Sequence, residues 1–221
     1  MAVSLQKGQK ISLEKDAGGK LMRFCVGCNW GAITTKGFLG FGGKTIDVDL
    51  DLSCVMFDSA GQMCDHLYSP LYREQFLAQY GLRAGKLSSN DGALRHTGDD
   101  RSGDTDGDDG LDNEIITVDL QKVNPNVKQI FFFLNNVGKE DFSQIPHAAI
   151  RMFEGTPERV KEVFATYNVA ADAKYKGMTA LVMGELYKHN DGWKFNAIGD
   201  TYPHPNLGVT IQLISKQYIR N

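Results

Sequence analysis

Apolar and polar positions alternate with a period of two through much of this chain. Residues 22–26 (MRFCV) and 47–52 (DVDLDL) place apolar side chains at every second position. This period is typical of β-strands that bury one face against a core. Residues 115–120, 148–153 and 161–169 read as further strands, so the sequence predicts a protein built mainly from short strands.

Two segments add detail to this picture. The run IFFFL at residues 130–134 is short and uninterrupted, which is typical of a strand buried on both faces. Residues 179–200 give the clearest hairpin signal, because an Asn-Asp-Gly turn at 190–192 tolerates positive φ between two alternating segments. In this hairpin we expect Tyr187 and Trp193 to lie near each other across the strands.

Helical signals are fewer. Ser69-Pro70 resembles an N-cap followed by proline at the first helical position, and Gly81 stands where a C-terminal glycine is expected. Between them, aromatic side chains recur every four residues and predict a packing face: Tyr72, Phe76 and Tyr80. Residues 206–218 fit a helix and a strand alike. Together these patterns predict an all-β fold, a two-sheet antiparallel β-sandwich with one or two short helices, formed by residues 1–221 as a single domain.

The charge of the chain is unevenly distributed. The 221 residues are 42% hydrophobic and 23% charged, as in ordinary globular proteins. Residues 99–114 hold eight carboxylates and one arginine, so this tract carries −7 and the rest of the chain +4, for a net charge of −3. Such concentrated acidity favours a localised partner. Because no extended basic arm is present, we do not expect nucleic acid to be a partner.

The sequence also indicates a compartment. Residues 1–15 lack the apolar core of a secretory signal, and no apolar stretch is long enough for a membrane span. We therefore expect a cytoplasmic protein that does not span a membrane, with peripheral association left open. Its cysteines should be reduced. Cys25 and Cys28 have C-x-x-C spacing but no matching second pair, so buried thiols are favoured over a zinc site.

The acidic tract is the strongest candidate for chemistry. Crowded like charges repel each other unless solvent, salt or a bound cation separates them. Gly103, Gly107 and Gly110 let the backbone turn several carboxylates inward, and calcium favours such flexible, oxygen-rich loops. A solvated surface loop is the alternative interpretation. An EF-hand is excluded, because Ile115 stands where that loop requires its last glutamate.

A second acidic element precedes the tract. In DVDLDLS, the strand period places Asp47, Asp49 and Asp51 on one face, about 7 Å apart. Aspartate is depleted in strands, so three on one face indicate a compensating partner. The end of this strand and the acidic loop are expected to share cations. Because one ion does not absorb so many carboxylates, two adjacent sites are predicted.

Catalytic signals are weak by comparison. His96 adjoins the acidic tract and is expected to order the entrance of the loop, because calcium prefers oxygen ligands over imidazole. Arg101 either neutralises part of the loop or clamps an anionic substrate beside a metal. Nothing pairs Ser102 with a base, so a hydrolytic triad has no support. We expect no enzymatic activity; the alternative is a metal-dependent phosphoesterase with His96 and Arg101 beside the metal.

Four segments carry recognisable motifs: residues 49–53 (DLDLS), 90–109 (NDGALRHTGDDRSGDTDGDD), 142–153 (FSQIPHAAIRMF) and 184–202 (GELYKHNDGWKFNAIGDTY). Together these segments resemble the TerD family of bacterial tellurium-resistance and stress-response proteins. The resemblance covers nearly the whole chain. It implies a β-sandwich that binds two calcium ions, has no established enzymatic activity, and acts in tellurite resistance, phage and colicin tolerance and general stress response. The implied partners are calcium and other tellurium-resistance or stress proteins.

The resemblance also implies a ligand set. The family's DLD motif matches Asp49 and Asp51, and its GDNxTGxGxGDDE loop matches positions within residues 99–114. With the remaining carboxylates of the loop, the predicted metal ligands are Asp49, Asp51, Asp99, Asp100, Asp104, Asp106, Asp108, Asp109 and Glu114.

The chain departs from the family pattern in several places. Asp100 stands where the family usually has asparagine, Thr105 replaces a glycine, and residues 110–113 are inserted before Glu114. Asp112 is therefore an alternative to Glu114 as a ligand. Residues 68–87 also resemble an insertion, which would contain the predicted helix.

Overall fold

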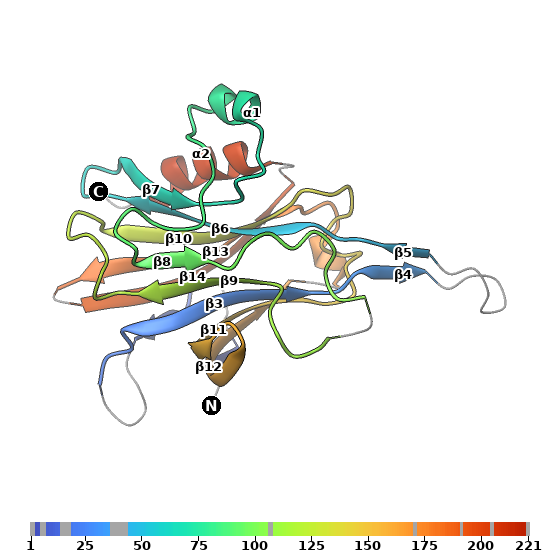
Figure 1. Ribbon diagram of the computed structural model, residues 1–221, viewed down its shortest axis with the longest axis horizontal. Coiled ribbons are helices and arrows are strands. Elements are labelled where there is room, and N and C mark those ends of the chain that lie inside the picture. The colour runs from blue at the N-terminus through green and yellow to red at the C-terminus, as the bar shows by residue number, and fades with distance from the viewer. Residues whose placement is uncertain are drawn as a thin grey trace.

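Two stacked β-sheets form the body of the molecule (Figure 1). The computed structural model describes residues 3–4, 8–13, 19–35, 44–105, 108–169, 172–190, 192–203 and 206–219. The first sheet has the order β1 (Val3–Ser4), β12 (Arg159–Asn168), β11 (Ala148–Thr156), β3 (Arg23–Trp30), β9 (Glu114–Asp119), β8 (Leu94–His96). The second has the order β2 (Lys10–Ser12), β14 (Gly192–Tyr202), β13 (Ala180–His189), β10 (Gln129–Asn136), β6 (Leu50–Phe57), β7 (Met63–Leu67).

Neighbouring strands run antiparallel in both sheets, except that β1 pairs in parallel with β12. A separate ribbon of β4 (Ile33–Thr35) and β5 (Lys44–Ile46) projects from one end (Figure 1). The helices are α1 (Glu74–Gln79) and α2 (Leu207–Gln217), with a 3-10 turn at Ala173–Tyr175. The prediction of a mainly β, two-sheet sandwich with two short helices is confirmed.

The main core lies between the sheets. Side chains of β3, β9 and β11 meet those of β6, β10 and β13 in one buried cluster, which includes Val26, Ile116 and Met152 from the first sheet and Leu52 and Phe132 from the second. Burial of this apolar surface is the dominant favourable term in folding. The segment before β6 and the loop between β8 and β9 carry the acidic residues. Because these strands belong to the core, the core fixes the positions of the ends of both acidic segments.

The second sheet is covered on its outer face as well. Helices α1 and α2 lie over it (Figure 1), and Phe131 and Phe133 point into this second cluster while Phe132 points into the main core. Every residue of β10 is buried. This confirms that the uninterrupted apolar run is buried on both faces. The ambiguous segment at 206–218 forms the covering helix α2, whose N-cap Asn206 accepts a hydrogen bond from the Val209 amide.

The start of the first helix was predicted wrongly. Helix α1 begins at Glu74, because the Ser69 hydroxyl accepts the Leu71 amide in a local turn and Ser69 does not cap a helix. Its predicted end is confirmed by Gly81, whose φ is 67°. The aromatic stripe is also confirmed, since the rings of Tyr72 and Phe76 and those of Phe76 and Tyr80 lie 5.7 and 5.4 Å apart.

The hairpin of β13 and β14 is confirmed, but one of its predicted contacts is not. Tyr187 pairs with Lys194, and Lys188 pairs with Trp193. Because side chains alternate between faces, Tyr187 and Trp193 point to opposite sides of the sheet. Of the cysteines, three are buried and Cys64 is exposed. No helix in the described part of the chain is long and apolar enough to cross a membrane.

Candidate metal centre

Three carboxylates from two segments meet at the start of β6. Asp51 lies in β6, Asp49 two residues earlier, and Asp99 in the loop between β8 and β9. One oxygen from each lies within 4.8 Å of the other two, and we call this group the inner triad. The strand begins only at Leu50, so the prediction of three aspartates on one strand face was wrong: Asp47 is exposed and lies outside the group.

Burial and neighbouring negative charge raise the pKa values of two members of the inner triad. Burial, followed by the charges of Glu114, Asp99 and Asp49, raises the pKa of Asp51 to about 8, although a hydrogen bond from Tyr72 opposes the shift. Burial and the charge of Asp99 also raise the pKa of Asp49. Oδ1 of Asp49 is buried and has no hydrogen-bond partner among the described residues. A cation at this point would relieve both the repulsion and the unpaired oxygen.

One basic side chain comes close to this group. The Nε of Arg101 lies 3.9 Å from Asp49 Oδ2, but the Arg101 side chain is 72% exposed. An ion pair so accessible to water is weak. It offsets only a small part of the charge of three carboxylates.

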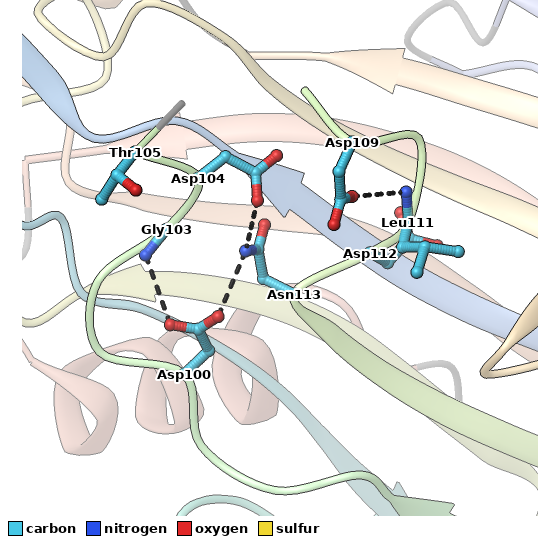
Figure 2. Close-up of a pocket in the computed structure, with 8 residues that line it drawn as sticks. All are labelled: Asp100, Gly103, Asp104, Thr105, Asp109, Leu111, Asp112 and Asn113. Carbon is cyan, nitrogen blue, oxygen red and sulfur yellow. Dashed lines mark hydrogen bonds between the residues drawn. The ribbon is translucent and has the colours of Figure 1, made fainter. Parts of the chain in front are cut away.

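A second group of carboxylates lies in the acidic loop itself. Asp104, Asp108 and Asp109 each bring one oxygen within 4.8 Å of the others, and we call this group the outer triad. Two of them, Asp104 and Asp109, line an open pocket of about 460 Å³ from the two arms of the loop (Figure 2). Asp106, another predicted ligand, lies outside the described residues.

Strand β3 holds the loop in place. The amide of Asp104 donates to the Trp30 carbonyl at 2.9 Å, and the Asp104 carbonyl accepts the Ala32 amide at 2.9 Å. The amide group of Asn29 donates to Asp104 Oδ2 at 3.3 Å and to Asp108 Oδ1 at 3.4 Å. Gly103 has a φ of 70°, and a Cβ there would lie 2.5 Å from the Trp30 ring. A side chain at this position would displace the loop.

Asp100 braces the loop from within and belongs to neither triad. Its Oδ1 accepts the amide and the hydroxyl of Ser102 at 2.9 and 3.0 Å, and its Oδ2 accepts the Asn113 amide group at 3.2 Å (Figure 2). Burial acts to raise the pKa of Asp100, but these hydrogen bonds outweigh it and lower that pKa. The carboxylate is already well satisfied by the protein.

Glu114 connects the loop to the second sheet and also lies outside both triads. It is 1% exposed, and it accepts the Leu52 amide at 2.7 Å and the Asp100 amide at 3.0 Å. Burial raises its pKa, against a contact with His96 Nε2 at 3.4 Å. His96 Nδ1 accepts the Gly98 amide and Nε2 lies 2.9 Å from the Leu52 carbonyl, so Nε2 carries the proton. His96 thus orders the loop entrance, as predicted.

Sequence reasoning missed several contacts at this site, and two of them join segments far apart in the sequence. Asp112, the proposed alternative to Glu114, is fully buried and accepts the Arg151 Nε at 2.9 Å. Burial raises its pKa to about 6 although Arg151 opposes the shift, and Gly27 lies so close that a Cβ there would be 2.1 Å from Asp112 Oδ2. The second contact is the hydroxyl of Tyr72, which donates to Asp51. No local pattern reveals pairs this far apart; the aromatic stripe pointed only to packing.

Comparison with known proteins agrees with this architecture. The model of the TerD domain family matches residues 1–210. Tellurium resistance protein TerZ of Serratia marcescens is 32% identical over 95% of this chain and 93% of its own length. Stress response protein SCP2 of Bacillus subtilis (strain 168) is 34% identical over 90% and 92%.

A solved structure shows the same fold. It is a homologue of telluride resistance protein (TerD) from Streptomyces coelicolor A3(2), which superposes with a TM-score of 0.58 at 13% identity and covers 89% of this chain and 96% of its own. The likeness to that structure shows the fold alone. The family match and the two relatives extend over nearly the full length of this chain. This chain therefore belongs to the TerD domain family.

Proposed function

We propose that this protein is a calcium-binding, non-catalytic β-sandwich that acts in tellurite resistance or stress response. Its relatives include proteins named for tellurium resistance and for stress response. In this proposal the protein works in the cytoplasm, and bound calcium controls its contacts with other resistance or stress proteins. Binding of two ions, one at each triad, is part of the same proposal.

The inner triad is the observation that carries the proposal. Asp51 is 4% exposed and lies beside two further carboxylates, one of which has a buried oxygen without a partner among the described residues. Such a group is costly without a cation, because burial disfavours uncompensated charge. All the ligands offered are oxygens, which favours a hard cation. Their irregular arrangement suits calcium better than magnesium, which requires a near-octahedral shell.

The outer triad supports a second ion of lower affinity. Asp108 and Asp109 are exposed, and Asp104 is partly buried. Exposed acidic groups are common without any metal, so this triad alone is weaker support than the inner one. Its position across an open pocket leaves room for water molecules to complete a calcium shell.

The absence of catalysis is proposed from the state of His96. Both of its ring nitrogens are engaged within the protein, so it does not offer a base to a substrate. Arg101, beside Asp49, is the one observation that favours a metal-dependent phosphoesterase instead. Assays of phosphomonoester and phosphodiester substrates with Mg²⁺, Mn²⁺ and Ca²⁺ should show no turnover. Turnover lost in Asp51→Asn would favour the enzyme.

Calorimetric titration of chelator-stripped protein with Ca²⁺ and with Mg²⁺ tests the proposal. We expect two calcium ions per chain and weaker binding of magnesium. Asp51→Asn should remove one ion, and Asp108→Asn with Asp109→Asn should remove the other. Asp47→Asn is the matched control, because Asp47 is an exposed aspartate outside both triads. Absence of calcium binding, or an unchanged stoichiometry in both variants, would contradict the proposal.

A further inference from the structure

A groove lies on the helix-covered side of the second sheet. It has a volume of about 280 Å³ and is lined by the segment that enters α1, the end of β10 and the start of α2. We call it the helix-side groove. The lining residues that matter here are Leu71, Tyr72, Arg73, Phe76, Asn135 and Val137. Its volume lies just below that of small-molecule pockets, which start at about 300 Å³, and suits the insertion of one or two side chains.

The groove exposes apolar side chains to solvent. Leu71 is 63% exposed and Val137 is 48% exposed. Only one other large hydrophobic residue in the described ranges, Leu111, is so exposed, and it lies in the acidic loop. With the partly buried ring of Phe76, these two side chains form one contiguous apolar surface. Contiguous exposed apolar surface of this kind marks binding sites more often than scattered residues do.

The wall of the groove also contains a polar atom without a partner. Asn135 is 1% exposed, and its Nδ2 donates to Thr210 Oγ1 at 2.9 Å. Its Oδ1 is buried and accepts no hydrogen bond within the described chain. Buried carbonyl oxygens are normally hydrogen-bonded. Asn135 therefore leaves one buried acceptor unsatisfied beside the groove.

Two walls of the groove are attached to the inner triad. The hydroxyl of Tyr72 donates to the Asp51 carboxylate. On the other wall, the amide of Val137 donates to the Asp49 carbonyl at 2.9 Å. An ion that draws Asp49 and Asp51 together would therefore act on both walls. Two hydrogen bonds thus connect the walls of the groove with the segments that carry the inner triad.

The charge of the groove indicates which kind of ligand it binds. Arg73 is exposed and is the only charged residue among the described residues that line the groove. It favours an acidic group beside an apolar anchor. Without calcium, the neighbouring inner triad repels such a group, and a bound divalent cation reduces that repulsion.

We infer that the helix-side groove binds a short peptide segment of a partner protein. An apolar side chain of the peptide packs against Leu71, Phe76 and Val137, and an adjacent aspartate or glutamate faces Arg73. Only the calcium dependence of this binding rests on the proposed function; the peptide site itself rests on the groove.

Selection of a phage-displayed random peptide library on the intact protein, in millimolar calcium, tests this inference. We expect enriched peptides to carry Leu, Ile or Phe beside Asp or Glu. The dissociation constant of a synthetic enriched peptide, measured by fluorescence anisotropy, should rise about tenfold or more in Leu71→Ser with Val137→Ser. Both residues are exposed, so this variant should fold normally. Val160→Ser, on the first sheet away from the groove, is the control.

Further measurements separate this inference from the calcium proposal. Arg73→Glu should lower the affinity for acidic peptides and raise the affinity for the same peptides with lysine in place of the acidic residue. In the wild-type protein, chelator should lower the peptide affinity about fivefold or more. Failure to enrich any peptide, or equal binding to the Leu71→Ser, Val137→Ser variant, would overturn the peptide site. Peptide binding that depends on the groove in a protein shown not to bind calcium would overturn only the proposed function. Unchanged affinity in chelator, in a protein that binds calcium, would overturn the coupling.

Discussion

The two triads contain the same kind of side chain in different surroundings. The inner triad is attached to β6, where Asp51 is buried between the core residues Leu50 and Leu52. The outer triad lies in the loop, where Asp108 and Asp109 are exposed and accept the amides of residues 110 and 111, each at 2.8 Å. The core therefore positions the inner carboxylates, whereas the loop positions the outer ones through its own turns.

This difference separates the energetic roles that we propose. Burial holds the inner carboxylates together whether or not an ion is present, so they are preorganised and destabilise the metal-free protein. The outer carboxylates can separate into water at little cost, so they bind with less strain and less preorganisation. We expect the inner triad to have the larger effect on the stability of the metal-free protein. Ion binding at the outer triad should depend on the conformation of the loop.

The sharpest test of the contrast is the pH dependence of metal-free stability. The pKa of Asp51 is about 8 in the folded protein against about 3.9 for a free aspartate, so the folded state binds the extra proton. Its contribution to the free energy of unfolding is complete below about pH 4 and is lost as pH rises through about 8, a change of about 6 kcal/mol, of which about 4 kcal/mol falls between pH 5 and 9. Urea unfolding from pH 5 to 9 should show this fall. Asp51→Asn should flatten the dependence of the unfolding free energy on pH, and Asp47→Asn should not. Equal slopes in the wild-type protein and both variants would refute this prediction.

The outer triad can be disturbed alone through Arg151. Arg151→Met leaves Asp112 buried without its partner, which we expect to cost about 3–5 kcal/mol in urea unfolding. Because the pKa of Asp112 rises further in this variant, the cost should be larger at pH 8 than at pH 5. Calcium binding should weaken at the outer triad only.

Two controls apply to this variant. Arg159→Met, at an exposed arginine of β12, should have little effect. Adding Asp112→Leu to Arg151→Met should recover part of the stability, because no unpaired charge is then buried. Loss of inner-triad binding in Arg151→Met would show that the two triads are not independent.

Calcium should stabilise the protein through two separate increments in the free energy of unfolding, one for each triad. At a hundredfold excess over the dissociation constant, each ion adds about 2.7 kcal/mol, or about 5–10 °C in melting temperature. Differential scanning calorimetry should show one portion missing in Asp51→Asn and the other missing in Asp108→Asn with Asp109→Asn. A calcium increment that survives in both variants would assign the ions elsewhere.

The smallest effect should come from Tyr72→Phe. It removes the hydroxyl that donates to Asp51, and we expect a loss of about 1–2 kcal/mol in the metal-free protein. Tyr80→Phe removes a hydroxyl from the same aromatic stripe and serves as the control. A double-mutant cycle with Asp51→Asn measures the coupling, and a coupling near zero would show that the contact does not contribute.

Local sequence patterns correctly predicted the elements that depend on short-range interactions. The uninterrupted apolar run became β10, and the Asn190 region became a hairpin turn with a φ of 53° at Asn190. The start of α1 was wrong because one serine can cap a helix or close a turn, and sequence does not distinguish them. The side chains of Tyr187 and Trp193 were misplaced because their relation depends on strand register.

The candidate site shows the same division. Its acidic segments were evident from composition, and six of the nine predicted ligands fall in the two triads. Asp100 and Glu114 do not, because each carboxylate accepts hydrogen bonds from backbone amides that come close only in the folded protein. The ion pair of Asp112 with Arg151 spans 39 positions and arises only when β11 packs beside β3. Such contacts depend on topology, which residue spacing does not encode.

Trp30 gives the molecule an intrinsic optical reporter. Its indole N–H donates to the Val48 carbonyl at 2.7 Å, next to Asp49, and its ring touches Gly103, next to Asp104. One fluorophore therefore lies between the inner and outer triads and is shielded from solvent. The other tryptophan, Trp193, is in the β13–β14 hairpin, away from both triads. We therefore expect calcium binding at either triad to change the emission wavelength and quenching of Trp30, which can be followed in real time without an attached dye.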